Sequence, residues 1–207
     1  MSVVATTDGH ALPPAAPSPR RNVALVGSIF AIGAGAMLIG GLLAAYFGAR
    51  EVVQNAGGTW VDTTKVHLPN MALAMTYLSL FMSSFTAQWA VSAIKLDDRR
   101  QAYVAMGLTL VFATAFLNGI TFCWAQIGAK AGDGAFGDHM YAVTAVHVLL
   151  VLAAIVFFAV MAFRALGGHF SPKNAEFVAA AVAFWHFVVV AGVVVWWCIW
   201  FLEGGPN

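Results

Sequence analysis

Two histidines in apolar stretches are the side chains of this sequence best able to bind a metal or a haem. His147 lies within residues 139–163 and His186 within residues 177–202, and neither stretch contains Asp, Glu, Lys or Arg. In two antiparallel helices these histidines would lie on the order of 12 Å apart along the helix axes. Two ligands of one metal must lie much closer together. We therefore predict no metal or cofactor on this chain, and polar or lipid-headgroup contacts for both histidines.

The two cysteines are weaker candidates for chemistry. Cys123 and Cys198 lie toward the same end of two apolar stretches, so their depth permits a disulfide. Free cysteines are also common in apolar packing, and we favour packing. The sequence has no CxxC pair, phosphate loop or nucleophile triad, so we predict no catalytic residue.

The composition indicates the environment of the chain. Of 207 residues, 61% are hydrophobic and 9% charged, and the mean hydropathy is +0.82. A soluble domain has about 25% charged residues, so a soluble globular fold is excluded. The net charge of +1 gives no indication of a nucleic-acid partner. An integral membrane protein remains.

Five segments without any Asp, Glu, Lys or Arg predict an all-α bundle of five transmembrane helices. Each has 25 to 29 residues, and about 20 residues suffice to cross the hydrocarbon. Barrel strands, at about 10 residues with alternating polarity, fit poorly. The predicted spans are residues 22–49, 66–94, 101–129, 139–163 and 177–202.

The basic residues predict the orientation of this single membrane domain, residues 22–203. One side would carry seven Lys and Arg and the other three, and the richer side faces the cytoplasm. The N-terminus is then cytoplasmic and the C-terminus outside. Residues 1–21 are expected to form a flexible cytoplasmic tail, and residues 204–207 a short outer end.

Small residues recur at every fourth position of the first span. Ala36, Gly40, Ala44 and Gly48 therefore share one helix face, which lets another helix approach closely. The sequence leaves open whether that helix belongs to this chain or to another subunit.

Two other classes of membrane protein remain as alternatives. A small transporter or channel would need a polar path, yet the five spans contain no acid. An independent membrane enzyme would need an active site centred on His147 or His186.

Several short motifs resemble subunit III of the haem–copper oxidases, the cytochrome c oxidase type, in its short five-helix bacterial form. The first span ends in a G-L-x-x-x-Y-F-x-x-R pattern, the second contains Ser-Ser-x-Thr, and the last contains Trp-His-Phe-Val. The matching residues are Gly41, Leu42, Tyr46, Phe47 and Arg50; Ser83, Ser84 and Thr86; and Trp185, His186, Phe187 and Val188. The loop residues Phe170, Ser171 and Pro172 and the residue His147 also resemble the family.

The resemblance implies an accessory, non-catalytic subunit of a proton-translocating oxidase in the bacterial inner membrane. Haem and copper would belong to the partner subunits I and II. Subunit III would pack on subunit I, bind phospholipid, and support assembly, stability and proton uptake. Trp185, His186 and His147 are then candidates for lipid or polar contacts. A quinol oxidase or a nitric oxide reductase is a close alternative as the complex.

Three positions depart from the family pattern. Gly35 stands where the family has a membrane-buried glutamate, Leu150 where it has a second histidine, and Val189 where it has an aspartate. The resemblance ties these polar groups to proton supply and lipid binding. We therefore expect the chain to keep the packing role and to lack the polar groups tied to proton handling.

Overall fold

The computed structural model describes residues 22–172 and 174–203, which are mostly helical. The all-α prediction is confirmed, and each of the five predicted segments contains a helix. The predicted tail, residues 1–21, and end, residues 204–207, lie outside the described residues. The elements are α1 (Val23–Asn55), α2 (Asn70–Lys95), α3 (Arg99–Gln126), α4 (Ala135–Leu166), α5 (Glu176–Val195) and the π-helical turn η1 (Trp196–Phe201).

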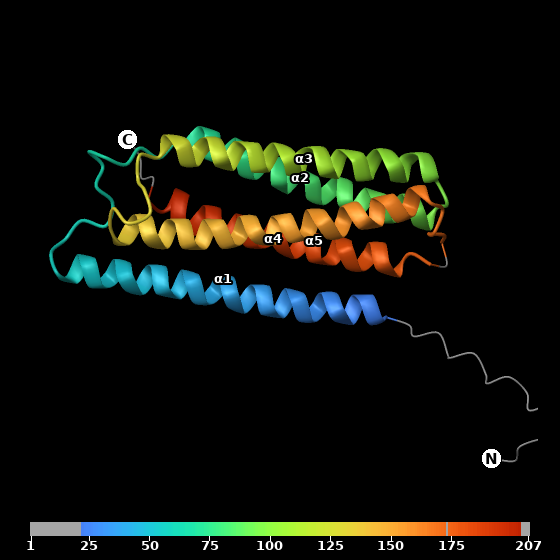
Figure 1. The fold of residues 1–207 in the computed structure, drawn as a ribbon, viewed down its shortest axis with the longest axis horizontal. Coiled ribbons are helices and arrows are strands. Elements are labelled where there is room, and N and C mark those ends of the chain that lie inside the picture. Colours follow the sequence, from blue (N-terminus) through green and yellow to red (C-terminus); the bar gives the residue numbers. More distant parts are fainter. Residues whose placement is uncertain (1–21, 173, 204–207) are drawn as a thin grey trace, which may run out of the picture.

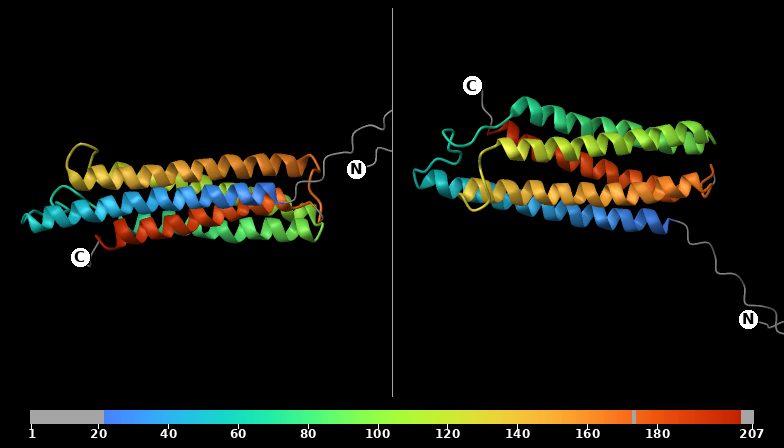
Figure 2. Two further views of the ribbon diagram at one scale, coloured as in Figure 1. Left: turned by 90° about the horizontal axis from the view of Figure 1, so that it is seen from below. Right: turned by 45° about the horizontal axis from the view of Figure 1, so that its top comes forward.

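The five helices run side by side along one long axis (Figure 1). In this view α1 lies at one edge, α2 and α3 lie at the opposite edge, and α4 and α5 lie between them; Figure 2 gives two further views. Helix α5 contacts α1, α2 and α4, and it is the most buried of the apolar helices. The Trp-His-Phe-Val motif of α5 is thus placed where three neighbouring helices can contact it.

Local sequence explains where the helices begin and end. The carboxylate of Asp98 accepts a hydrogen bond from the backbone N–H of Gln101 at 3.0 Å, which caps the start of α3. Pro69 immediately precedes α2. Helix α1 continues past the predicted span end at Ala49 to Asn55, because charged residues can extend a helix beyond the hydrocarbon.

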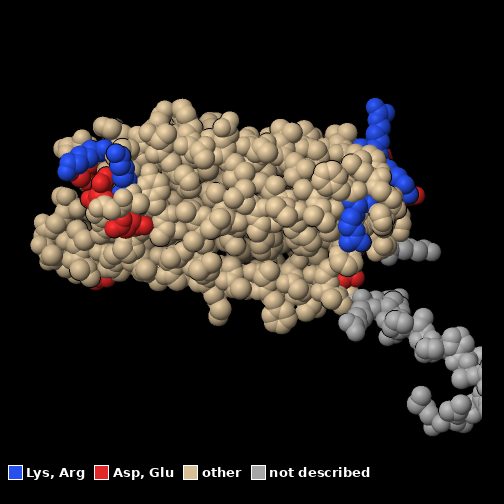
Figure 3. Space-filling view, viewed as in Figure 1, with Lys and Arg blue, Asp and Glu red and all other residues tan. Residues whose placement is uncertain are grey.

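Four helices are long and apolar enough to cross a membrane: α1, α3, α4 and the continuous stretch from Glu176 to Phe201. Helix α2 has 26 residues, but its several Ser and Thr residues make it less apolar. On the face seen in Figure 3, charged side chains gather at the two ends of the bundle and leave the middle without charge. The chain is therefore a membrane protein with several apolar helices.

Candidate functional site

Two sequence motifs that lie far apart along the chain meet between α2 and α5. The indole Nε1 of Trp185 donates a hydrogen bond to Ser83 Oγ at 2.9 Å, and Ser84 Oγ lies 2.5 Å from His186 Nδ1. Both pairs are separated by 102 residues. The Ser-Ser motif of α2 and the Trp-His motif of α5 thus bond to each other. We call Ser83, Ser84, Gln88, Trp185 and His186 together the α2–α5 seam.

His186 uses both ring nitrogens within this seam. Its Nε2 lies 3.2 Å from Gln88 Oε1, and an amide oxygen can only accept. A neutral ring with its proton on Nε2 satisfies both contacts, with Nδ1 accepting from the Ser84 hydroxyl. The half-buried imidazole therefore links two helices.

Trp185 and Ser83 form the buried half of the seam. Trp185 is 1% exposed, and its ring packs against Phe158 with centroids 5.3 Å apart. The Ser83 hydroxyl accepts from Trp185 and donates to Leu80 O at 2.5 Å, so its hydrogen-bonding capacity is used on both sides. A fully paired polar contact of this kind is inexpensive inside a bundle and fixes the register of the two helices.

His147 is fully buried at the junction of α2, α3, α4 and α5. Its ring lies against Tyr77 and Phe116, and its Nε2 donates to the carbonyl of Val188 at 3.1 Å. Gly192 makes room for it, since a Cβ at that position would lie 2.9 Å from the imidazole atoms Cε1 and Nε2. His147 and His186 thus have separate surroundings, and each bonds to groups of this chain.

A second polar cluster ties the end of the described chain to α1. The buried Tyr46 hydroxyl accepts from Trp60 Nε1 at 3.0 Å and donates to Glu203 Oε1 at 3.1 Å. Arg50 Nε forms an ion pair with the same carboxylate oxygen at 3.0 Å. Burial raises the pKa of Glu203 above its usual range, although Arg50 and Tyr46 act in the opposite direction.

Sequence reasoning identified Tyr46 and Arg50 as motif residues but missed their partner. Glu203 is the acid that directly follows the last apolar segment. In a bundle with an odd number of helices, this position falls at the same end as Arg50. The position of Glu203 in the sequence could therefore have indicated its ion pair with Arg50.

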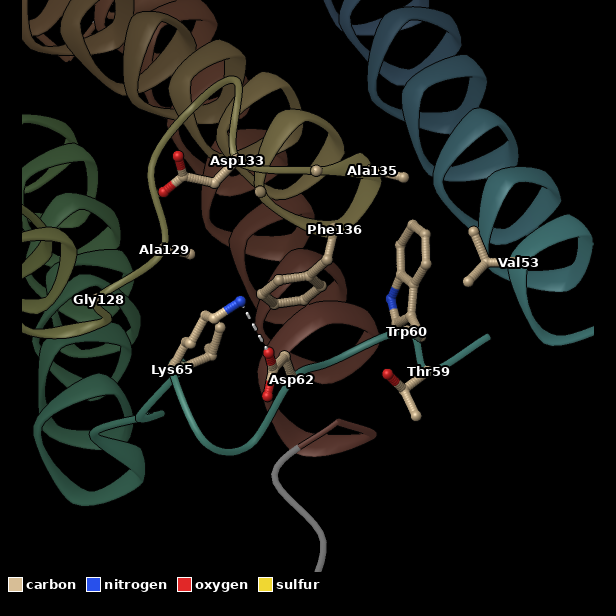
Figure 4. Close-up of a pocket in the computed structure, with 13 residues that line it drawn as sticks. Val53, Thr59, Trp60, Asp62, Lys65, Gly128, Ala129, Asp133, Ala135 and Phe136 are labelled. Carbon is tan, nitrogen blue, oxygen red and sulfur yellow. Dashed lines mark ion pairs between the residues drawn. The ribbon is translucent and has the colours of Figure 1, made fainter. Parts of the chain in front are cut away.

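A pocket of about 490 Å³ lies at the same end of the bundle, between the α1–α2 and α3–α4 loops (Figure 4). Trp60 and Phe136 line it with rings that meet edge to face at 5.9 Å. Asp62 and Lys65, paired at 3.3 Å, and the carboxylate of Asp133 add charge to its lining. No sequence pattern predicted this pocket, because it depends on how two separate loops pack.

The sequence matches the cytochrome c oxidase subunit III family over residues 20–203. The chain belongs to that family. It is 30% identical over 153 residues to the cytochrome c oxidase subunit 3 of Pylaiella littoralis, an alignment that covers 70% of this chain and 56% of that protein. It is 28% identical over 192 residues to a probable cytochrome c oxidase subunit 3 of Nocardia farcinica (strain IFM 10152), covering 89% and 90%. The subunit 3 of Salmo salar is 26% identical over 202 residues, covering 93% and 74%.

Membership in the subunit III family confirms the prediction of an accessory subunit of a terminal oxidase. It also implies a complex with other oxidase subunits. The α2–α5 seam and the Tyr46–Arg50–Glu203 cluster give physical roles to the motifs that carried the resemblance. These residues connect helices to one another and to the end of the chain.

Two of the three departures from the subunit III pattern, Gly35 and Leu150, fall in one apolar contact of α1, α4 and α5. A Cβ at Gly35 would lie 2.7 Å from Cε1 of Phe187 and 3.8 Å from Cδ1 of Leu150. The positions of the family glutamate and second histidine are therefore neighbours. Val189 is buried on α5. In this family member, ring and alkyl groups fill the space at Gly35.

The predicted helix-packing face of α1 points away from the bundle. Ala36, Gly40, Ala44 and Gly48 are all exposed, and no atom lies within 4 Å of a Cβ built at either glycine. The buried side of α1 is instead formed by Ser28, Gly35, Ile39, Leu43 and Tyr46. Within the chain, the small-residue face therefore has no close partner among the described residues.

Both cysteines are free thiols in the structure, as the packing interpretation expected. Cys123 is buried, and its sulfur lies 3.9 Å from the Thr76 hydroxyl. Cys198 is half-buried in η1.

Proposed function

We propose that this chain is the short, five-span form of subunit III, which packs on catalytic subunit I of a bacterial cytochrome c oxidase and stabilises it. Haem and copper belong to subunits I and II in this proposal. The observation that carries it is the α2–α5 seam, in which family motifs serve as links between helices. The Nocardia relative, which aligns over nearly its whole length, supports a bacterial cell membrane.

Helix α2 is proposed as the fifth span. Its 26 residues extend about 39 Å, enough to cross about 30 Å of hydrocarbon. Several of its Ser and Thr hydroxyls are paired within the helix: Thr76, Ser79 and Ser83 donate to carbonyls of α2 itself. The excess of Lys and Arg at the end of the bundle opposite Trp60 supports a cytoplasmic N-terminus and an outer C-terminus.

The outward face of α1 is proposed as the contact with subunit I. Transmembrane helices associate through small residues that allow close backbone approach, and Gly40 and Gly48 present an unobstructed surface of that kind. Replacing both with leucine should weaken retention of subunit I. The same double replacement at Ala31 and Ala34, exposed residues nearer the start of α1, serves as a control.

Phospholipid is proposed to reach the chain at His186. Of the three predicted lipid or polar candidates, His147 and Trp185 are buried and make their polar contacts inside the bundle. Only the half-buried His186 has surface left for a lipid. We expect any influence on proton uptake to act through the contact with subunit I, because Gly35 and Val189 supply no acid.

Purification through a tag on this chain in mild detergent tests the proposal. We expect a haem-containing subunit to copurify and the complex to oxidise reduced cytochrome c. Recovery of the chain without any haem protein would contradict the proposal. If the complex oxidised a quinol instead of cytochrome c, the chain would be assigned to a related quinol oxidase.

A further inference from the structure

A band of polar residues lies on the outward face of α3, away from α2. A shallow groove there is lined by Val111, Thr114, Ala115, Leu117, Asn118 and Thr121. Thr114, Asn118 and Thr121 are exposed, although α3 is one of the helices apolar enough to span the membrane.

The amide of Asn118 distinguishes this face from an ordinary lipid-facing surface. The Thr114 hydroxyl donates to Val111 O at 2.9 Å, and the Thr121 hydroxyl donates to carbonyls of its own helix. The Asn118 side chain makes no such bond to any residue that the structure describes. Two N–H donors and one carbonyl acceptor therefore lie on the exposed face of α3 without a partner among the described residues.

The depth of Asn118 excludes the usual polar partners of an exposed amide. In the 28-residue helix α3, Asn118 lies about 8 Å from the midpoint, whereas the hydrocarbon extends about 15 Å on each side of the bilayer centre. Water and lipid headgroups lie beyond that boundary. An amide in hydrocarbon needs a hydrogen-bonding partner from another protein segment.

We propose that one transmembrane helix of another chain of the complex packs on this face and presents an amide or hydroxyl side chain to Asn118. The small side chain of Ala115 allows that helix to approach closely. Helices α1 and α3 lie at opposite edges of the bundle (Figures 1 and 2), so this helix is distinct from the one proposed on α1. The inference rests on the proposed place in an oxidase complex, which also favours another chain over a second copy.

Site-specific photo-crosslinking in the intact complex tests this inference. A benzoylphenylalanine in place of Val111, an exposed residue that lines the same groove and leaves Ala115 unchanged, should crosslink to a transmembrane segment of another chain. Peptide mass spectrometry should map the crosslink to a helix that contains an Asn, Gln, Ser or Thr. The same photoreactive residue in place of Leu149, an exposed residue of α4, is the matched control and should label lipid. Asn118→Leu should reduce recovery of the crosslinked chain about three- to thirtyfold, and Asn118→Gln should restore much of it.

The outcomes separate this inference from the proposed function. If the haem-containing complex copurifies but the probe at position 111 labels only lipid, or only a second copy of this chain, the docking face on α3 is wrong. An unchanged yield of the crosslinked chain with Asn118→Leu would also overturn it. Absence of the haem-containing complex would instead count against the proposed function. Because Asn118 lies on the surface, the helix content of the Asn118→Leu variant should match that of the wild type.

Discussion

Replacing Gly192 with alanine should destabilise the bundle, although alanine normally favours a helix. The added Cβ would lie 2.9 Å from two imidazole atoms of His147 and 3.1 Å from Cδ2 of Leu80. His147 is fully buried, so its ring can yield only by disturbing Tyr77 and Phe116. We therefore expect overpacking at the junction of four helices.

The magnitude of this effect follows from three contributions. Overpacking a buried site costs about 1–3 kcal/mol, and loss of the bond from His147 to Val188 O costs about 1 kcal/mol. Alanine in place of glycine within a helix raises the free energy of unfolding by about 1 kcal/mol. The Gly192→Ala variant should therefore be less stable by about 1–3 kcal/mol.

Reversible unfolding in mixed micelles, followed by helix signal, would measure this change. Gly33→Ala is the matched control, because no atom lies within 4 Å of a Cβ at Gly33. It should leave stability unchanged or raise it by up to about 1 kcal/mol. In a His147→Ala background the cost of Gly192→Ala should largely disappear. An equal cost in both backgrounds would refute the role of the imidazole.

Three further predictions concern the seam, the end of the chain and the departures from the family. Ser83→Ala should lower the free energy of unfolding by about 1–3 kcal/mol, because it leaves the Trp185 indole unpaired. Trp185→Phe should lower this free energy less in the Ser83→Ala background than in the wild type. Burial raises the folded-state pKa of Glu203 above its ordinary 4.5, so the folded chain binds this proton more tightly than the unfolded chain. The contribution of Glu203 to stability should fall as the pH rises from below 4.5 through the raised folded-state pKa. If the melting temperature of Glu203→Gln varied with pH as steeply as that of the wild type, this prediction would be contradicted. Gly35→Glu should reduce the yield of folded chain because its side chain meets the Phe187 ring, and Phe187→Ala should recover part of that yield if the clash is the cause.

The fold was predictable in its main features because membrane helices are specified by composition. Charge-free stretches located the five α-helices of the described residues, and the small errors fall at ends such as Asn55, where charged residues continue a helix. Helix α2 was the difficult case. Its Ser and Thr side chains lower its hydropathy, yet several of them bond to backbone carbonyls of the same helix, which a hydropathy sum does not include.

The site was less predictable because its contacts join distant parts of the chain. The resemblance identified Ser83, Ser84, Trp185 and His186 separately, but only the packing of α2 on α5 showed that they bond to one another. The small residues that share one face of α1 with Gly40 could be read directly from the sequence. Its outward direction depends on Ile39 and Leu43 being buried on the opposite side.

Native mass spectrometry of the complex isolated through this chain would test the central claim most directly. We predict an assembly in which the 21.9 kDa chain is bound to larger subunits that carry haem. Release of the chain alone, or in copies of itself without haem, would contradict its assignment as a stabilising subunit of an oxidase.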